Sequence, residues 1–206
     1  MLCCAIACMK RVWPLIAALV FLSACIQTPT AEEILTKLYE RYEEAESYKA
    51  KIQEVSDNHV SYINVAFKKP DRMRIEYLPE NTVSVFNGSA VKICSGNGSK
   101  TITLNRVVDF YYGHFLEMLK SYEVTLVGEE KVVVNNESKE CYVLAAKDGG
   151  KGEVEIEKVW VVKGEWYPAK IQLRVSFPEN NTVTLHFVSM ELDATLSDSL
   201  FEPCDL

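Results

Sequence analysis

Two periodicities of hydrophobic and polar positions divide the chain into helical and extended segments. Between residues 31 and 46, apolar side chains recur at helical spacing and the opposite positions are mostly charged. This spacing predicts an amphipathic helix over 31–46. Thr30 and Glu33 stand at the N-cap and N3 positions of a capping box at its start. An aromatic-rich segment from Asp109 to Tyr122 predicts a second helix.

From residue 48 onward the period changes to two. Apolar and polar residues alternate through short segments, among them 48–53, 72–77, 170–177 and 182–187. Turn-forming residues such as Asn87-Gly88 separate these segments. The pattern predicts about eleven half-buried antiparallel strands and not βαβ units. Because an open twisted sheet beyond about ten strands tends to curl or close, we expect the two helices across its concave face.

The N-terminus has the pattern of an export signal. Lys10 and Arg11 precede an apolar run, residues 12–22, that is too short to span a bilayer comfortably. The sequence Leu-Ser-Ala-Cys at 22–25 follows directly and resembles the lipobox of prokaryotic lipoproteins, in which the cysteine becomes the lipidated first residue. We therefore expect a lipoprotein signal peptide over 1–24, a tether over 25–30 and one domain over 31–206. A plain secretory signal and an uncleaved anchor are the alternatives.

Cleavage before Cys25 changes the charge of the chain. The full sequence has 206 residues and a formal charge of −7, and loss of Lys10 and Arg11 makes it −9. Such an acidic chain lacks the basic footprint that nucleic-acid binding requires. Attraction to anionic headgroups would not hold it at a membrane either. We expect a protein on the extracytoplasmic side of the cell membrane, anchored there by the lipid on Cys25.

The residue patterns of common catalytic sites are missing from the sequence. His59, His114 and His186 lie far apart, and there is no HExxH motif, GxSxG elbow or phosphate-binding loop. The glutamates of 153–157 alternate with apolar residues, which is typical of the solvated face of a strand. We expect no catalytic residue, no metal and no cofactor, in a protein that is not an enzyme.

Three cysteines remain beyond Cys25: Cys94, Cys141 and Cys204. An extracytoplasmic setting permits one disulfide among them, in any of three pairings. We expect the pairing Cys141–Cys204, which would fix the C-terminal tail. The alternative is three buried thiols.

Several segments in sequence order resemble the LolA/LolB-like superfamily of outer membrane lipoprotein-sorting proteins. The first helix runs into residues 47–52 as in the opening of that family, and 67–77 resembles its basic-Pro-x-x-aromatic/apolar-Arg strand pair. Residues 85–88 stand at its Asp-Gly hairpin, 166–170 resemble its x-x-Pro-x-Lys strand start, and 196–201 resemble its last turn. The likeness covers nearly the whole mature chain.

The resemblance implies an α+β fold, an unclosed (half) antiparallel β-barrel with a lid of amphipathic helices over an apolar cavity. In this family LolA carries the acyl chains of lipoproteins, LolB receives them, and MucB and RseB use a related domain to sense lipids or misassembled lipoproteins. A basic residue just before the proline holds the lid of LolA closed. The matching residue here is Lys69, where the family has arginine.

The expected function is therefore the binding of lipid or lipoprotein acyl chains by a lipid-anchored carrier or acceptor. Its partners would be the membrane, an acyl-chain ligand, and another lipoprotein or membrane protein. The candidate lining residues of the cavity are Leu35, Leu38, Tyr42, Ile75, Phe110, Phe115, Leu119, Leu173 and Phe187. One alternative is that these residues fill an ordinary core. The other is a tethered sensor or scaffold that binds a partner protein.

Overall fold

The computed structural model describes residues 28–57, 59–88, 90–103, 109, 111–147, 152–176 and 180–202. The predicted signal peptide, residues 25–27 of the predicted tether (Cys25 among them), Phe110 and Cys204 lie outside these residues. The helices are α3 (Ala31–Glu44), α4 (Tyr112–Leu119) and the short 3-10 helix η1 (Asp198–Phe201). No helix in the described part of the chain is long and apolar enough to cross a membrane.

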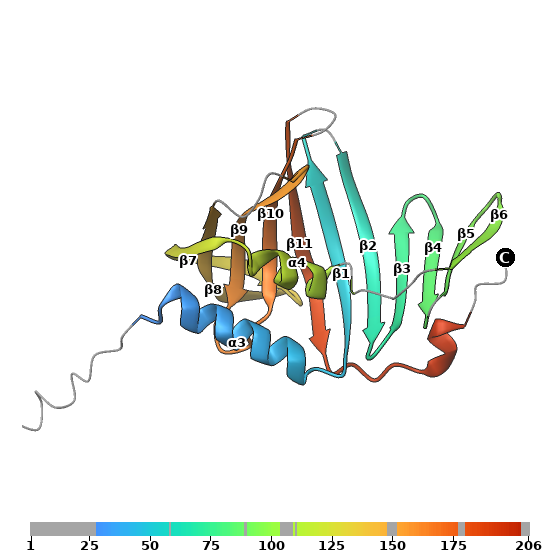
Figure 1. Ribbon diagram of the computed structural model, residues 1–206, viewed down its shortest axis with the longest axis horizontal. Coiled ribbons are helices and arrows are strands. Elements are labelled where there is room, and N and C mark those ends of the chain that lie inside the picture. The colour runs from blue at the N-terminus through green and yellow to red at the C-terminus, as the bar shows by residue number, and fades with distance from the viewer. Residues whose placement is uncertain are drawn as a thin grey trace, which may run out of the picture.

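Eleven strands form one antiparallel sheet (Figure 1). They are β1 (Ser47–Ser56), β2 (His59–Lys68), β3 (Arg72–Leu78), β4 (Thr82–Asn87), β5 (Ala90–Ser95), β6 (Gly98–Thr103), β7 (Glu123–Val134), β8 (Glu137–Lys147), β9 (Val154–Val162), β10 (Pro168–Val175) and β11 (Asn181–Leu192). Their order is β6-β5-β4-β3-β2-β1-β11-β10-β9-β8-β7, so β6 and β7 are the two edges and the sheet is open. The predicted half-barrel of about eleven strands is confirmed.

The two helices lie across one face of the sheet (Figure 1). Tyr48, Ala50 and Ile52 on β1 are buried on this face, whereas Lys49 and Lys51 between them are exposed on the other. Side chains of α3, α4 and most of the strands form one hydrophobic cluster between the helices and the sheet. The alternation in the sequence therefore predicts correctly which face of β1 is buried.

Strand β7 curls the sheet toward closure. Its pairing with β8 has a register shift between Leu126 and Gly128, and a bulge of this kind bends a strand. The turn beyond β7 reaches β11, where the Asn135 amide donates to the Met190 carbonyl oxygen and accepts from the Met190 N–H, at 2.9 and 3.1 Å. Asn135 adopts a left-handed backbone conformation with φ 54°, which asparagine tolerates better than most residues.

Hydrogen bonds explain where the helices begin and end. The capping box of α3 is confirmed, since Glu33 N–H donates to Thr30 Oγ1 at 3.2 Å and Thr30 N–H donates to Glu33 Oε2 at 2.8 Å. Helix α4 is shorter than predicted. At its C-terminus the N–H groups of Ser121 and Tyr122 donate to carbonyls only three residues back, which ends the α-helical pattern.

The cysteine pairing expected from the sequence is wrong. Cys141 on β8 is a fully buried free thiol, whereas Cys94 on β5 is disulfide-bonded. Burial raises the pKa of the Cys141 thiol to about 11, so the thiolate needed for disulfide exchange is scarce at neutral pH. Strand membership alone could not separate the two cysteines, because both lie in strands as predicted.

Candidate functional site

The helix-covered face brings the predicted lining residues together. Of the nine, eight belong to the hydrophobic cluster or pack against it, and Phe110 lies outside the described residues. The buried members are Leu38, Ile75, Phe115, Leu119, Leu173 and Phe187, and the half-buried members are Leu35 and Tyr42. The sequence therefore identifies a real cluster. In this conformation its side chains pack against one another as a core.

Helix α3 is held to the rest of the molecule by polar contacts mainly at its C-terminal end. Lys69 Nζ donates to the carbonyl oxygens of Tyr42 and Glu43, at 3.2 and 2.6 Å, and lies 5.5 Å from the centroid of the Tyr42 ring. The contact satisfies last-turn carbonyls and places a positive charge at the negative end of the helix dipole. Nearer the helix middle, the Tyr39 hydroxyl donates to the Leu116 carbonyl of α4 at 3.1 Å.

We predict that Lys69→Met loosens the C-terminal end of α3. The substitution keeps a similar aliphatic chain and removes the charge and both hydrogen bonds, so the free energy of unfolding should fall by about 1 kcal/mol. Amide hydrogen exchange of residues 40–46 should accelerate. Lys69→Arg is the matched control and should retain protection there, because guanidinium also donates to carbonyls. Equal protection in wild type and Lys69→Met would contradict the contact.

A second polar contact joins α3 to the end of β11. Arg41 Nη2 donates to Asp193 Oδ2 at 2.8 Å, and the Glu46 N–H donates to Asp193 Oδ1 at 3.1 Å. The hydrogen bond from Arg41 holds the pKa of the Asp193 carboxyl below its usual value. Asp193 has φ 56°, in the left-handed region, where aspartate and asparagine are both tolerated.

This contact predicts a small loss of stability in acid. Because the folded pKa of Asp193 lies below its unfolded value of about 3.9, its contribution is present above about pH 4. That contribution is lost as pH falls through the folded pKa. Asp193→Asn keeps the backbone conformation and should remove about 0.5 kcal/mol at pH 7, since the pair is half exposed. Chemical denaturation at pH 7 and pH 3 measures it. A difference between wild type and variant that persists unchanged at pH 3 would contradict the ion pair.

A buried carboxylate organises the start of α4. Asp109 is 5% exposed and accepts the Tyr48 hydroxyl at 2.6 Å, together with the N–H groups of Tyr111, Tyr112 and Gly113 at 3.1, 3.1 and 2.8 Å. Burial raises the pKa of Asp109, although these hydrogen bonds favour the charged form. Burial and the Asp109 charge in turn raise the pKa of Tyr48. One side chain therefore joins β1 to the helix.

Helix α3 packs closely against α4 at Gly113. A Cβ at Gly113 would overlap the Tyr42 hydroxyl and lie 2.9 Å from Tyr42 Cζ. The Tyr42 and Tyr112 rings meet edge to face, with centroids 4.8 Å apart. The glycine is needed here for the close approach of the two helices.

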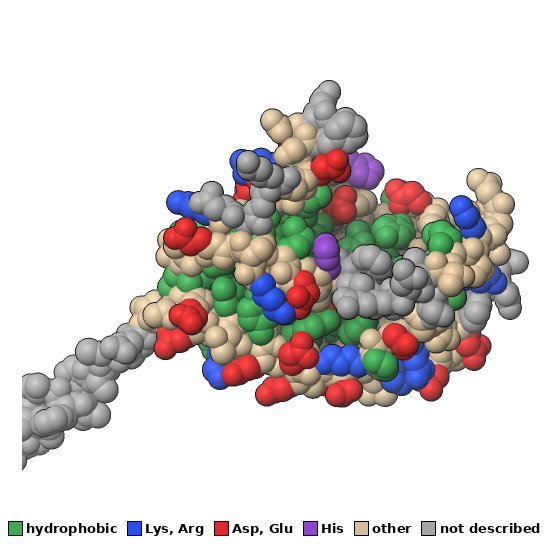
Figure 2. Space-filling model, viewed as in Figure 1, with side chains coloured by type: hydrophobic (Ala, Val, Ile, Leu, Met, Phe, Trp, Pro, Cys, Tyr) green, Lys and Arg blue, Asp and Glu red, His purple; other side chains and the backbone are tan. Residues whose placement is uncertain are grey.

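A small cavity of about 340 Å³ opens on the same face, at the end of β1–β4 that is remote from α3. Its lining residues are Glu54, His59, Ser61, Ile63, Tyr77, Glu80 and Thr82. Glu54 and Ser61 are cross-strand partners, and Ile63 pairs with Tyr77. Ile63 belongs to the hydrophobic cluster. The cavity thus has a mostly polar lining at the edge of the apolar cluster, and we call it the rim cavity. Figure 2 views this face and shows hydrophobic side chains beside acidic ones.

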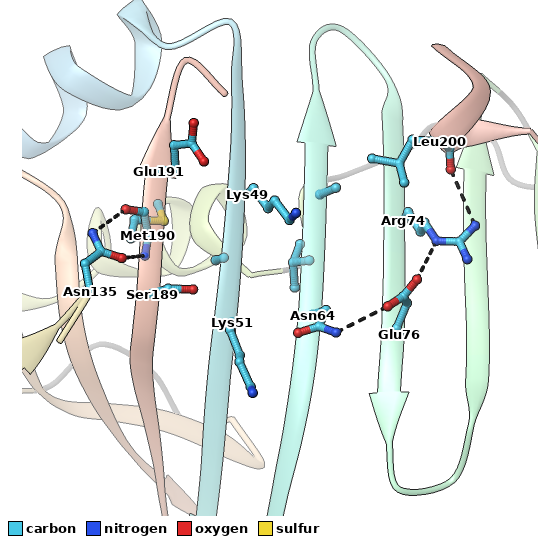
Figure 3. A pocket seen from close by; sticks show the side chains of 13 residues that line it. Lys49, Lys51, Asn64, Arg74, Glu76, Asn135, Ser189, Met190, Glu191 and Leu200 are labelled. Atoms are coloured by element: carbon cyan, nitrogen blue, oxygen red, sulfur yellow. Dashed lines mark hydrogen bonds and ion pairs between the residues drawn. The ribbon is translucent and has the colours of Figure 1, made fainter. Parts of the chain in front are cut away.

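A larger groove, of about 500 Å³, lies on the helix-free face (Figure 3). Lys49 and Lys51 on β1 project beside it, and neither forms an ion pair with a carboxylate among the described residues. On its far wall, Arg74 Nε donates to Glu76 at 2.8 Å and Nη1 donates to the Leu200 carbonyl at 3.5 Å. The groove has a mixed lining of charged, polar and apolar residues, and none of the predicted lining residues belongs to it.

Sequence reasoning missed Asp109, Gly113 and the rim cavity. An aspartate just before an apolar run is an N-cap signal, so Asp109 could have been found. The contact of Gly113 with Tyr42 and the grouping of Glu54, Ser61 and Glu80 depend on tertiary packing. Within the described residues, no group of three or more His, Cys, Asp or Glu side chains is arranged to hold a metal ion.

The sequence was compared with protein-family models and with curated proteins. No family model matches the sequence. An uncharacterized protein of Methanocaldococcus jannaschii, MJ0687, is 23% identical over 194 residues, which cover 89% of this chain and 54% of that protein. The chain thus spans about half the length of this curated relative.

Among solved structures, that of MucB superposes with a TM-score of 0.55 at 16% identity, over 84% of this chain and 62% of MucB. The chain has a LolA-like fold. The MucA/MucB complex of Pseudomonas aeruginosa matches with a TM-score of 0.51 at 14% identity, over 83% of this chain and 60% of that one. The LolA superfamily protein NE2245 of Nitrosomonas europaea matches with a TM-score of 0.40 at 16% identity, over 84% and 98%.

Proposed function

We propose that this LolA-like protein binds the acyl chain of an amphiphile between its two helices and the sheet, as a non-catalytic carrier or acceptor. It would do so at the extracytoplasmic side of the cell membrane, held by a lipid on Cys25. The observation that carries the proposal is the way α3 covers the apolar cluster. Its polar contacts to the sheet are at its C-terminal end, whereas Ile34, Leu35 and Leu38 contribute apolar burial.

This arrangement suits a lid that moves about its C-terminal end. Separating the N-terminal half of α3 from the sheet breaks apolar contacts that an acyl chain can replace. Each CH₂ group that leaves water contributes about 0.8 kcal/mol. Bound chain therefore offsets the cost of opening the lid, and the strength of the α3 contacts sets the affinity.

A fluorescent monoacylglycerol tests the proposal on the chain from residue 25 onward, which contains every described element. Leu35→Gln changes a half-buried residue of the lid, and we expect it to weaken probe binding about tenfold with little loss of fold. Val133→Gln changes an exposed valine of β7, 55% exposed, and should leave binding unchanged. Equal weakening by both variants, or no probe binding to wild type, would contradict the proposed function.

A second candidate function is recognition of a partner protein by the helix-free face. The groove with the unpaired Lys49 and Lys51 favours it, and MucB, which has the same fold, forms a complex with MucA. In this case the apolar cluster would stay a filled core. Lys49→Glu with Lys51→Glu should then abolish cross-linking to that partner in cells and leave monoacylglycerol binding unaffected.

A further inference from the structure

The rim cavity indicates what kind of head the ligand carries. Resting on the proposed function, we propose that the cavity between Glu54, Ser61 and Glu80 receives the polar head of the amphiphile. We infer that this head is a hydrogen-bond donor without negative charge, either an ammonium or a polyhydroxyl group. Anionic heads such as phosphate are disfavoured there.

The first observation is a hydroxyl that faces the cavity without a protein partner. Ser61 on β2 is 8% exposed and lines the cavity, yet its hydroxyl has no hydrogen-bond partner among the described residues. The hydroxyl is not among the fully buried polar atoms that lack a partner, so it reaches the open cavity. A ligand hydroxyl or ammonium in the cavity would supply that partner.

The second observation is the charge around the cavity. Glu54 lies directly across from Ser61 in the β1–β2 ladder, and Glu80 lies in the turn between β3 and β4. Neither carboxylate forms an ion pair with a described residue. Among the described residues, no lysine or arginine lines this cavity, whereas Lys49, Lys51 and Arg74 line the groove on the opposite face. The rim therefore attracts donors and cations and repels anions.

The third observation is the position of the cavity. Ile63 lines it and also belongs to the hydrophobic cluster under the helices. Burial, followed by the nearby Tyr77 hydroxyl and the Glu54 charge, raises the pKa of Tyr111, which immediately precedes α4. The start of α4 thus adjoins the rim, so a chain in the cluster can leave its head among Glu54, Ser61 and Glu80.

Competition for the fluorescent monoacylglycerol tests the inference, with three competitors of one chain length kept below their critical micelle concentrations. At low ionic strength, dodecylamine and dodecyl maltoside should each displace half of the probe at a concentration at least about tenfold lower than dodecyl phosphate requires. Glu54→Gln with Glu80→Gln should reduce the preference for the amine over the phosphate to about twofold. Glu191→Gln, an exposed carboxylate on the opposite face, is the control and should keep the full preference.

Ser61→Ala separates a ligand contact from a structural role. Since the hydroxyl has no protein partner, its removal should leave thermal stability unchanged. It should weaken the binding of dodecyl maltoside about threefold to tenfold. Equal affinity of wild type for all three competitors would overturn the inference while leaving acyl-chain binding intact. Tighter binding of the phosphate would also overturn it. Failure of every amphiphile to bind would refute the proposed function itself.

Discussion

Asp109→Ala is expected to lower the free energy of unfolding by at least about 3 kcal/mol. The substitution leaves the Tyr48 hydroxyl and the N–H groups of Tyr111, Tyr112 and Gly113 without their acceptor. Each buried donor that loses its partner costs about 1–3 kcal/mol, and α4 loses the side chain that caps its N-terminus. Chemical denaturation followed by circular dichroism measures the loss.

The matched control removes a carboxylate that lies within α4 itself. Glu117 on the same helix is exposed and pairs with Lys120 at the surface, so Glu117→Ala should change stability little. Asp109→Asn should fall between the two, because an amide keeps one acceptor oxygen and replaces the other with a donor facing the Gly113 N–H. A loss after Asp109→Ala no larger than after Glu117→Ala would show that Asp109 does not hold α4 in place.

Gly113→Ala is expected to destabilise the protein by about 2 kcal/mol, although alanine normally stabilises a helix by up to about 1 kcal/mol relative to glycine. The added Cβ would overlap the Tyr42 hydroxyl and lie 3.0 Å from Asp109 Cβ. Overpacking of this kind typically costs about 1–3 kcal/mol. Because Tyr42 belongs to α3, relief of the clash would displace the lid, and monoacylglycerol uptake should become faster.

Tyr42→Phe tests the cause of this loss. It removes the hydroxyl that a Cβ at Gly113 would meet, so the double variant should recover about 1 kcal/mol relative to the sum of the two single variants. Denaturation curves of the four proteins give this coupling energy. Strict additivity would mean that Gly113 is required for some reason other than the approach of α3.

Most of the fold could be predicted from periodicity, because most strands have one solvent-facing and one buried face. The alternation at Tyr48, Ala50 and Ile52 gave the buried face of β1, and the capping box at Thr30 gave the start of α3. The curl of the sheet depends on the β7 bulge at Leu126 and on contacts of Asn135 with β11. Such contacts join residues far apart in sequence, so they cannot be predicted from the local pattern of hydrophobic and polar residues.

The candidate site divides in the same way. Apolar residues such as Leu38 and Phe187 could be predicted as one cluster, since each lies on the apolar side of its element. The rim could not, because it requires the register that sets Glu54 opposite Ser61. The cysteine pairing failed for a related reason: Cys94 and Cys141 are both buried in strands, and only their tertiary surroundings decide that one is bonded and the other free.

The central claim is that an amphiphile occupies the space between the helices and the sheet. Native mass spectrometry of the full chain, purified from membranes of the cells that produce it, measures this most directly. We expect one bound amphiphile per protein in addition to the lipid proposed on Cys25, and a marked loss of this amphiphile in Leu35→Gln but not in Val133→Gln. A protein that carries no such ligand, and takes up no monoacylglycerol when it is offered, would contradict the account.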